Sequence, residues 1–165
     1  MTTRRTFLRR AIWTPPVLLL ATACGGGSGV TVTIDHGPPA KLGEVMTFTM
    51  TATSGWDAPS PNDKYAPSNL ASLGFTLSAG LSSPDSGWTV FIAPNGKSSY
   101  SRNVVFQAKV PLTFEFQVKL EQPAEQHVVS ANAGVMDPGT NSGKATLYLK
   151  VDASGTAIQD NPFSR

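Results

Sequence analysis

Apolar and polar side chains alternate along most of the chain after residue 30. The pattern is clearest from Leu112 to Leu120, where apolar residues take every second position and Thr, Glu, Gln and Lys fill the places between them. A period of two is typical of a β-strand with one buried and one solvated face. No window of ten or more residues carries an apolar stripe at helical spacing. The sequence therefore predicts a domain built from strands.

Eight runs follow this alternation, and Gly, Pro, Asn and Asp separate them. The fourth run, in which Trp88, Val90 and Ile92 are expected to face the core, ends at the strong turn signal Pro94-Asn95-Gly96. Short strands divided by turns predict an antiparallel β-sandwich, and the lack of helical connections excludes a parallel α/β sheet. The runs cover residues 30–34, 46–52, 73–81, 88–92, 104–110, 112–120, 129–135 and 145–151.

Two stretches resemble strands of bacterial Ig-like surface repeats. Gly43–Thr53 follows the pattern G-x-x-v-t-f-t-i-t-v-t, and Leu112–Val118 with Val128–Val135 is similar to the last strands of such modules. The resemblance covers residues 30–152 and implies an all-β, Ig-like antiparallel β-sandwich of seven to eight strands. It also implies adhesion, spacing or assembly work in a cell envelope, with no catalytic residues to carry over. The paired cysteines of antibody-type domains are absent, so only the architecture is implied.

The first 24 residues follow a different pattern. Four arginines precede an uncharged run from Ala11 to Ala23, which stops at Cys24, the only cysteine of the chain. A basic start, a short apolar segment and small residues are typical of an export signal. The run is shorter than the roughly 20 apolar residues that a membrane-spanning helix needs. We therefore predict that residues 1–23 are a cleaved signal peptide.

The start of this signal resembles the twin-arginine export motif through Arg4, Arg5, Phe7 and Leu8. As generally understood, that route carries proteins that are already folded, some of them loaded with a cofactor.

Its end, Leu20–Cys24, resembles the lipobox of bacterial lipoproteins, although Ala21 stands where leucine is usual. The resemblance implies a diacylglycerol on the Cys24 thiol, further acyl chains and cleavage before that residue. Residues 24–29 would then be the lipidated Cys and a flexible Gly/Ser tether. The alternative is an ordinary signal peptide with a chance cysteine.

Cleavage changes the charge of the chain. It removes four of the 13 basic residues, and the nine that remain stand against 11 acidic ones, so the formal net charge goes from +2 to −2. No two of the remaining basic residues are adjacent, and nucleic-acid binding is not expected. The expected location is the bacterial cell envelope, on the periplasmic side or at the outer membrane and cell surface. Gly25 after the cysteine favours the outer membrane.

One connection is long and has no periodicity. Residues 54–69 hold three prolines together with Trp56 and Tyr65, and such a loop is uncommon unless it has a function or is disordered. Exposed aromatic side chains are common anchors of interfaces, so Trp56 and Tyr65 are the candidate contact surface. The alternative is a loop pinned by its own aromatics. Residues 153–165 are expected to form a flexible C-terminal tail.

A metal site is the main alternative chemistry. Two histidines, His36 and His127, exclude a three-histidine zinc site and the histidine-rich cluster of superoxide dismutases, but imidazole with thioether suits copper. Both histidines are expected at the surface, whereas two of the methionines share the side of Phe48 and are expected in the core. The candidate copper ligands are His36, His127, Met46, Met50 and Met136. The rival hypothesis is therefore a copper-binding or superoxide-dismuting sandwich that is exported folded.

Other chemistry has weaker support. No Gly-x-Ser-x-Gly motif occurs. The pair Asp57 and Asp63 is the nearest candidate for the paired carboxylates of a glycoside hydrolase. Residues 137–141 could supply oxygen ligands to calcium, but we expect them to form a turn and not a calcium site. Trp56, Trp88 or Tyr100 could stack on a sugar in a carbohydrate-binding module. The leading hypothesis is a lipid-anchored, non-catalytic envelope protein that contacts other envelope proteins, for which no cofactor is expected.

Overall fold

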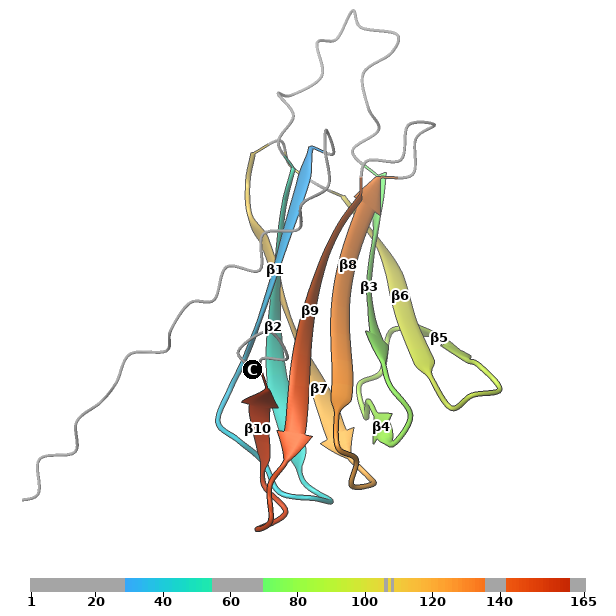
Figure 1. Cartoon of the computed structure of the whole chain (residues 1–165). Coiled ribbons are helices and arrows are strands. Elements are labelled where there is room, and N and C mark those ends of the chain that lie inside the picture. The colour runs from blue at the N-terminus through green and yellow to red at the C-terminus, as the bar shows by residue number, and fades with distance from the viewer. Residues whose placement is uncertain (1–28, 55–69, 106, 108, 136–141, 161–165) are drawn as a thin grey trace, which may run out of the picture.

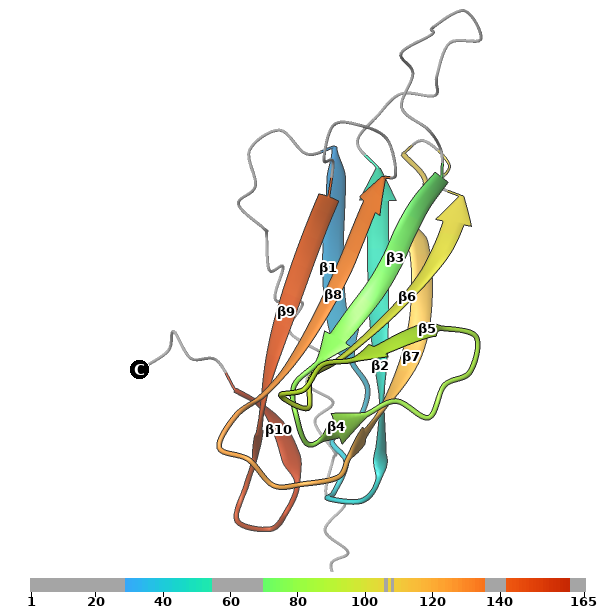
Figure 2. The same cartoon turned by 90° about the vertical axis from the view of Figure 1, so that its right-hand side faces the viewer.

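The computed structural model describes residues 29–54, 70–105, 107, 109–135 and 142–160, and every regular element within them is a β-strand. Two antiparallel sheets pack face to face (Figures 1 and 2). This arrangement confirms the predicted all-β, Ig-like sandwich, but the described residues form ten strands and not the expected seven to eight. The strands are β1 (Val30–His36), β2 (Val45–Ser54), β3 (Leu70–Leu77), β4 (Leu81–Ser82), β5 (Thr89–Ile92), β6 (Ser98–Val105), β7 (Leu112–Leu120), β8 (His127–Val135), β9 (Ser142–Val151) and β10 (Ala157–Asp160).

The smaller sheet has the order β1-β2-β7-β4 and the larger one β10-β9-β8-β3-β6-β5. Alternate residues of each long strand point into the space between the sheets, as the period of two predicted. Phe75 of β3 and Phe116 of β7 meet at the centre of this core, with ring centroids 4.1 Å apart. Phe48 of β2 stacks on the other side of Phe116 at 5.5 Å. These rings join the two sheets through apolar contact.

The sheets approach each other most closely where β1 packs on β9. At Gly143 of β9, a Cβ atom would lie 2.7 Å from the Val30 carbonyl oxygen and 2.9 Å from a methyl carbon of Val32. No side chain fits at such distances, so glycine allows the two backbones to touch. We call this side of the sandwich the closed seam. The opposite side, where β4 and β7 face β5 and β6, is the open seam.

The run from residue 73 to 81 is divided in the structure. β3 ends at Leu77, and the chain turns at Gly80, whose φ is +83°, before β4 joins the other sheet by pairing with β7. A positive φ favours glycine, which allows the change of sheet. Leu77 and Leu81 are both buried in the same core, but Ala79 between them is exposed, so the predicted alternation is interrupted at the turn.

The predicted strand over residues 104–110 is confirmed only at its start, where Val104 packs against the core, because β6 ends at Val105. Phe106 and Ala108 lie outside the described residues. β6 spans Ser98–Val105 and sends Ser98, Tyr100 and Arg102 towards the core, three side chains that an apolar pattern does not select. Val110 lies outside any strand and is exposed.

The larger sheet extends beyond residue 152, where the sequence analysis ended the sandwich. β10 pairs with β9, and Ala157, its first residue, is fully buried and donates its N–H to the Ala40 carbonyl at 2.8 Å. The turn before β10 is held by Asp152. Hydrogen bonds from the Ser154 hydroxyl and then from the Thr156 N–H lower the pKa of Asp152 below its usual value.

Candidate functional site: the uncovered β5 edge

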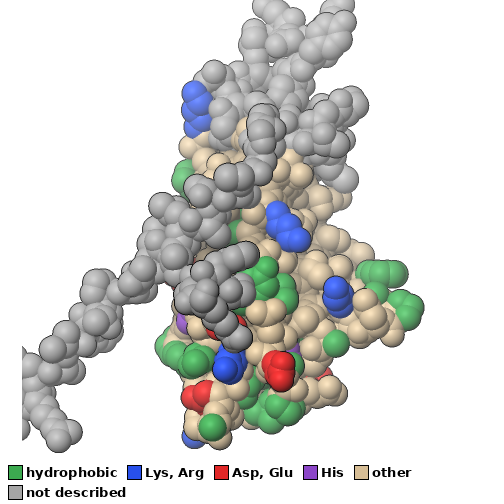
Figure 3. Space-filling model, viewed as in Figure 1, with side chains coloured by type: hydrophobic (Ala, Val, Ile, Leu, Met, Phe, Trp, Pro, Cys, Tyr) green, Lys and Arg blue, Asp and Glu red, His purple; other side chains and the backbone are tan. Residues whose placement is uncertain are grey.

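The strand at one edge of the larger sheet is apolar and exposed. All four residues of β5 are exposed, and the exposed fraction is 47% for Val90, 66% for Phe91 and 69% for Ile92. Figure 3 shows hydrophobic side chains gathered where the β5–β6 hairpin projects from the body. We call Val90, Phe91 and Ile92 the β5 patch. No charged side chain belongs to β5.

A tight turn builds this hairpin. Gly96 has a φ of +78° and donates its N–H to the Ala93 carbonyl at 2.9 Å, while the Ala93 N–H bonds to the Lys97 carbonyl at 2.8 Å. The Asn95 side chain accepts the Lys97 N–H at 3.2 Å. Pro94-Asn95-Gly96 therefore forms the predicted turn, and it returns β6 alongside β5.

The β5 patch is uncovered because the opposing sheet stops short of it. Val90 and Ile92 pair with Tyr100 and Ser98 and so share the core-facing side of the larger sheet. The last strand of the smaller sheet on this side, β4, has only two residues, Leu81 and Ser82. The expectation that the run 88–92 has a buried face was therefore wrong for Val90 and Ile92.

Aromatic and cationic side chains fill the space between the two sheets at the open seam, behind the β5 patch. The guanidinium carbon of Arg102 lies 4.4 Å from the Trp88 ring centroid and 4.1 Å from that of Phe114. Trp88 also meets Phe75 edge-on at 4.9 Å. Arg102 Nε is buried and has no hydrogen-bond partner among the described residues, and the guanidinium lies between the two rings. The Arg102 guanidinium of β6 thus contacts the Phe114 ring of β7, in the opposite sheet.

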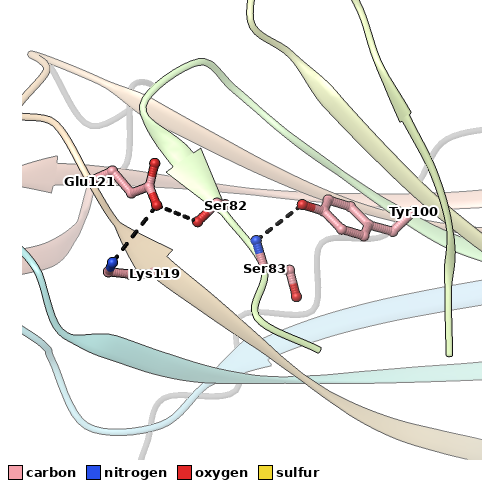
Figure 4. A network of polar contacts seen from close by, with 5 residues as sticks. All are labelled: Ser82, Ser83, Tyr100, Lys119 and Glu121. Atoms are coloured by element: carbon pink, nitrogen blue, oxygen red, sulfur yellow. Dashed lines mark hydrogen bonds and ion pairs between the residues drawn. The ribbon is translucent and has the colours of Figure 1, made fainter. Parts of the chain in front are cut away.

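Polar contacts fix the chain that leads into β5 (Figure 4). The Ser83 N–H donates to the Tyr100 hydroxyl at 3.1 Å, which ties this connection to β6. The Ser82 hydroxyl donates to Glu121 at 2.8 Å, and Lys119 lies 3.9 Å from the same carboxylate. The base of the hairpin is therefore anchored on both sheets while its outer strand is left open.

The outer side of β5 also presents backbone groups. Pairs of an antiparallel ladder alternate between hydrogen-bonded and non-hydrogen-bonded, and Ala93 is bonded to Lys97. Phe91, two residues from Ala93, accordingly directs its N–H and C=O towards Ser99 of β6. Val90 and Ile92 direct theirs away from the sheet. The edge therefore combines unpaired backbone groups with apolar side chains, which suits the addition of another strand.

Four of the five candidate copper ligands, His36, His127, Met46 and Met50, lie in the described part of the chain. Met46 and Met50 are buried in the core, as predicted. His36 is half-buried and donates from Nδ1 to the Gly37 carbonyl at 2.7 Å. His127 is fully buried, so its expected surface position was wrong: Nε2 donates to the Gln122 carbonyl at 2.9 Å, and Nδ1 lies 3.4 Å from the Ser78 hydroxyl.

No group of three or more His, Cys, Asp or Glu that could hold a metal ion is found among the residues with described positions. Two of the proposed sugar-stacking residues are also occupied. Tyr100 is 6% exposed and stacks on Phe75 at 4.5 Å, and Trp88 lies against Arg102 and Phe75. Tyr100 therefore presents no free face to a ligand, and Arg102 lies over the Trp88 ring.

Several predicted site residues lie outside the described residues. These are Arg4, Arg5, Phe7, Leu8, Cys24, Trp56, Asp57, Asp63, Tyr65, Met136 and the stretch 137–141. Sequence reasoning, in turn, missed Phe91 and Arg102. Neither has a signal in the sequence: Phe91 is exposed because β5 lies at the edge of its sheet, and Arg102 faces the core because of its ring partners.

Comparisons with known proteins add the following findings. The sequence matches no family model and no curated protein sequence. Among solved structures, the fold is similar to a cohesin module from Clostridium perfringens ATCC13124 family 33 glycoside hydrolase, at 12% sequence identity and a TM-score of 0.41. The match covers 74% of this chain and 96% of that chain. At these values the likeness implies nothing about function. In the described residues, no helix is long and apolar enough to cross a membrane.

Proposed function

We propose that this chain is a lipid-anchored protein of a bacterial cell envelope whose Ig-like domain is a non-catalytic contact module in envelope or surface-layer assembly. The anchor is supported by the sequence of residues 1–29, with its twin-arginine pattern, its lipobox-like end at Cys24 and its Gly/Ser tether. The contact role is carried by one observation, the exposed, uncharged β5 patch at a sheet edge.

An exposed apolar edge strand has a physical cost. Its side chains stay in contact with water, and its backbone groups offer a template for pairing with other chains. Natural sheets usually protect such an edge with charged residues, proline or a covering segment. Thr89–Ile92 has no charged residue and no proline, and no described segment covers it. A partner that covers Val90, Phe91 and Ile92 accounts for their apolar character, because buried apolar side chains provide much of the energy of binding.

The contact role is tested by recovering proteins bound to the full-length chain from solubilised envelope. We expect Ile92→Asp to abolish recovery of the partner, because it places a charge at the most exposed residue of the β5 patch. Ile158→Asp is the matched control, since Ile158 is also exposed, at 41%, but lies on β10 at the other edge. Equal recovery with both variants would contradict a contact role for β5.

Trp56 and Tyr65 belong to the same proposal as a second contact surface. The double variant Trp56→Ala and Tyr65→Ala is compared with Ile92→Asp in the same experiment. If only the double variant loses the partner, the contact surface is the 54–69 loop and not the β5 patch.

The anchor is tested by the mass of the mature protein. Acylation at Cys24 predicts a chain that begins at residue 24 and carries diacylglycerol and acyl chains. Cys24→Ser should release the protein from the membrane fraction with its fold unchanged. A mature chain with a free thiol at Cys24 would contradict the anchor, whatever the outcome for β5.

A further inference from the structure

We infer that the occupant of the β5 patch is a second copy of this chain, paired antiparallel, edge to edge, through β5 itself. The inference deepens the proposed contact role and rests on it in one respect, namely that membrane anchoring brings copies together. The central observation is that β5, although short, carries none of the side chains by which an edge strand avoids its own copies. It has no Lys, Pro or charged side chain, and apolar residues occupy both of its faces.

The other edge of the same sheet shows what such protection looks like. β10 contains Gln159 and Asp160, and Asp160 pairs with Tyr148 of β9. The segment before β2 covers the start of β10: Ala40 accepts the Ala157 N–H at 2.8 Å, and Lys41 forms a bridge with Thr156. The chain thus blocks association at one edge and leaves it open at the other.

One register satisfies both the backbone and the side chains of two β5 strands. With the two-fold axis at Phe91, Val90 of one copy lies opposite Ile92 of the other, and the reverse pair completes the symmetry. Val90 and Ile92 are the residues whose N–H and C=O point away from β6. Each Val90–Ile92 pair can therefore exchange two hydrogen bonds. All four outward groups of each β5 strand are then paired.

The side chains agree with this register. Phe91 faces its own symmetry mate on the outer side of the sheet, where it shares a face with Ser99. Val90 and Ile92 meet on the side that the smaller sheet leaves uncovered. The next pair would set Trp88 opposite Pro94, and proline has no N–H to donate, so pairing ends at the four-residue strand. Shifting the register by two residues would need Trp88, whose ring is already held by Phe75 and Arg102.

The geometry also suits two copies on one membrane. A two-fold axis in an antiparallel edge pairing is perpendicular to the sheet, so the two domains point in opposite directions within a common plane. If that plane is parallel to the membrane, both Val30 ends lie at the same height and both tethers reach the surface. Four residues from each copy form a small interface, well below the roughly 800 Å² per partner of a stable complex. Pairing is accordingly weak in dilute solution and depends on the local concentration that the anchor provides.

Disulfide trapping in the envelope of cells that produce the full-length chain tests this register. Phe91→Cys places a thiol opposite its own mate in a non-hydrogen-bonded pair, where Cα atoms are about 4.5 Å apart, within the range that a disulfide bridges. Ser99→Cys is the matched control on the same face, one strand further in. Its symmetry mates would be three strand spacings apart, about 14 Å. Ile158→Cys controls for random collision.

After addition of an oxidant, we expect the Phe91→Cys dimer to exceed both controls by on the order of tenfold, since only this pair lies within disulfide distance. Adding Ile92→Lys to Phe91→Cys should remove the excess, because it sets a charge and no apolar contact opposite Val90. Ile92 is 69% exposed, so the fold tolerates lysine there. The inference would be overturned if the Phe91→Cys variant gave no more disulfide dimer than the controls. It would also be overturned if adding Ile92→Lys left the amount of Phe91→Cys dimer unchanged.

The two proposals fail in different ways. If Ile92→Asp loses a different protein while Phe91→Cys gives no dimer, the contact role stands and self-pairing is overturned. If the wild-type chain itself forms a disulfide dimer, its only cysteine, Cys24, is not acylated. That result would contradict the anchor, while the Phe91→Cys comparison, repeated in a Cys24→Ser background, would still decide the register.

Discussion

The two edge strands of the six-stranded sheet differ in how far they are covered: β10 is partly covered by another segment of the chain, and β5 is exposed. β10 begins with a buried Ala157, pairs on one side with β9 and is covered at its start by residues 40–42. β5 is held only by β6 and presents apolar side chains to solvent. The difference shows that exposure at β5 is not a general property of this sheet. It is local to one strand, and so it can be changed without changing the fold.

A charge at each edge should give the largest contrast. Ala157→Asp buries an unpaired carboxylate at the covered edge, and we expect it to lower the free energy of unfolding by about 3–5 kcal/mol. Ile92→Asp at the open edge should change it by less than about 0.5 kcal/mol. Urea denaturation of both variants measures the two values. A large loss in Ile92→Asp would mean that the β5 patch contributes to the core.

Substitutions of Arg102 test whether its guanidinium stabilises the packing of the two sheets at the open seam. Arg102→Ala removes the guanidinium from between Trp88 and Phe114, and we expect a loss of about 2 kcal/mol from two cation–π contacts and lost packing. Arg102→Lys keeps the charge but not the planar group and should lose less. Hydrogen exchange should rise in β5 and β6 and stay constant in β9 and β10. Equal stability of all three proteins would exclude a structural role for the stack.

The glycine turns of the two edge hairpins differ in a smaller way. Gly96 and Gly155 both have a φ of +78°, but only Gly96 has a neighbour, because an added Cβ would lie 3.1 Å from the Ala79 Cβ. Gly155→Ala should cost about 1 kcal/mol from backbone strain alone, and Gly96→Ala up to about 2 kcal/mol. Thermal unfolding of the two variants gives the comparison. The reverse order would show that the crowding at Gly96 is relieved by movement of the hairpin.

The smallest effect concerns Asp152, which holds the turn before β10. Its lowered pKa means that the stabilisation is complete above the ordinary aspartate value of 3.8 and is lost as the pH falls through the lowered pKa. Asp152→Asn should remove this acid dependence from β10 and leave β5 unaffected. An NMR titration of the Asp152 carboxyl, with Ser154→Ala as the variant that raises its pKa, checks the assignment. An unchanged pKa in Ser154→Ala would contradict it.

Much of the fold could be predicted because strand alternation follows burial directly. β7 was expected over Leu112–Leu120 and has these bounds, and the apolar positions of β2 are buried as expected. Periodicity shows which side chains share a face but not whether another sheet covers that face. Val90 and Ile92 were assigned to the core for this reason, although the short β4 leaves them exposed.

Other features depend on partners distant in sequence. Arg102 is a core-facing residue only because Trp88 and Phe114 surround its guanidinium. His127 is buried because the Gln122 carbonyl and the Ser78 hydroxyl satisfy its ring. A local pattern of apolar residues contains no information about such pairings. The candidate contact surface at β5 was missed for the same reason, since it required the place of the strand within the sheet.

The closed seam also determines how the domain would carry tension. Val30 is the first residue of β1 and touches β9 at Gly143. If residues 24–29 form the proposed tether, a pull directed along β1 from this end would act parallel to the strand. The seven residue pairs between Val30–His36 and β2 would then be loaded together in shear rather than separated one at a time.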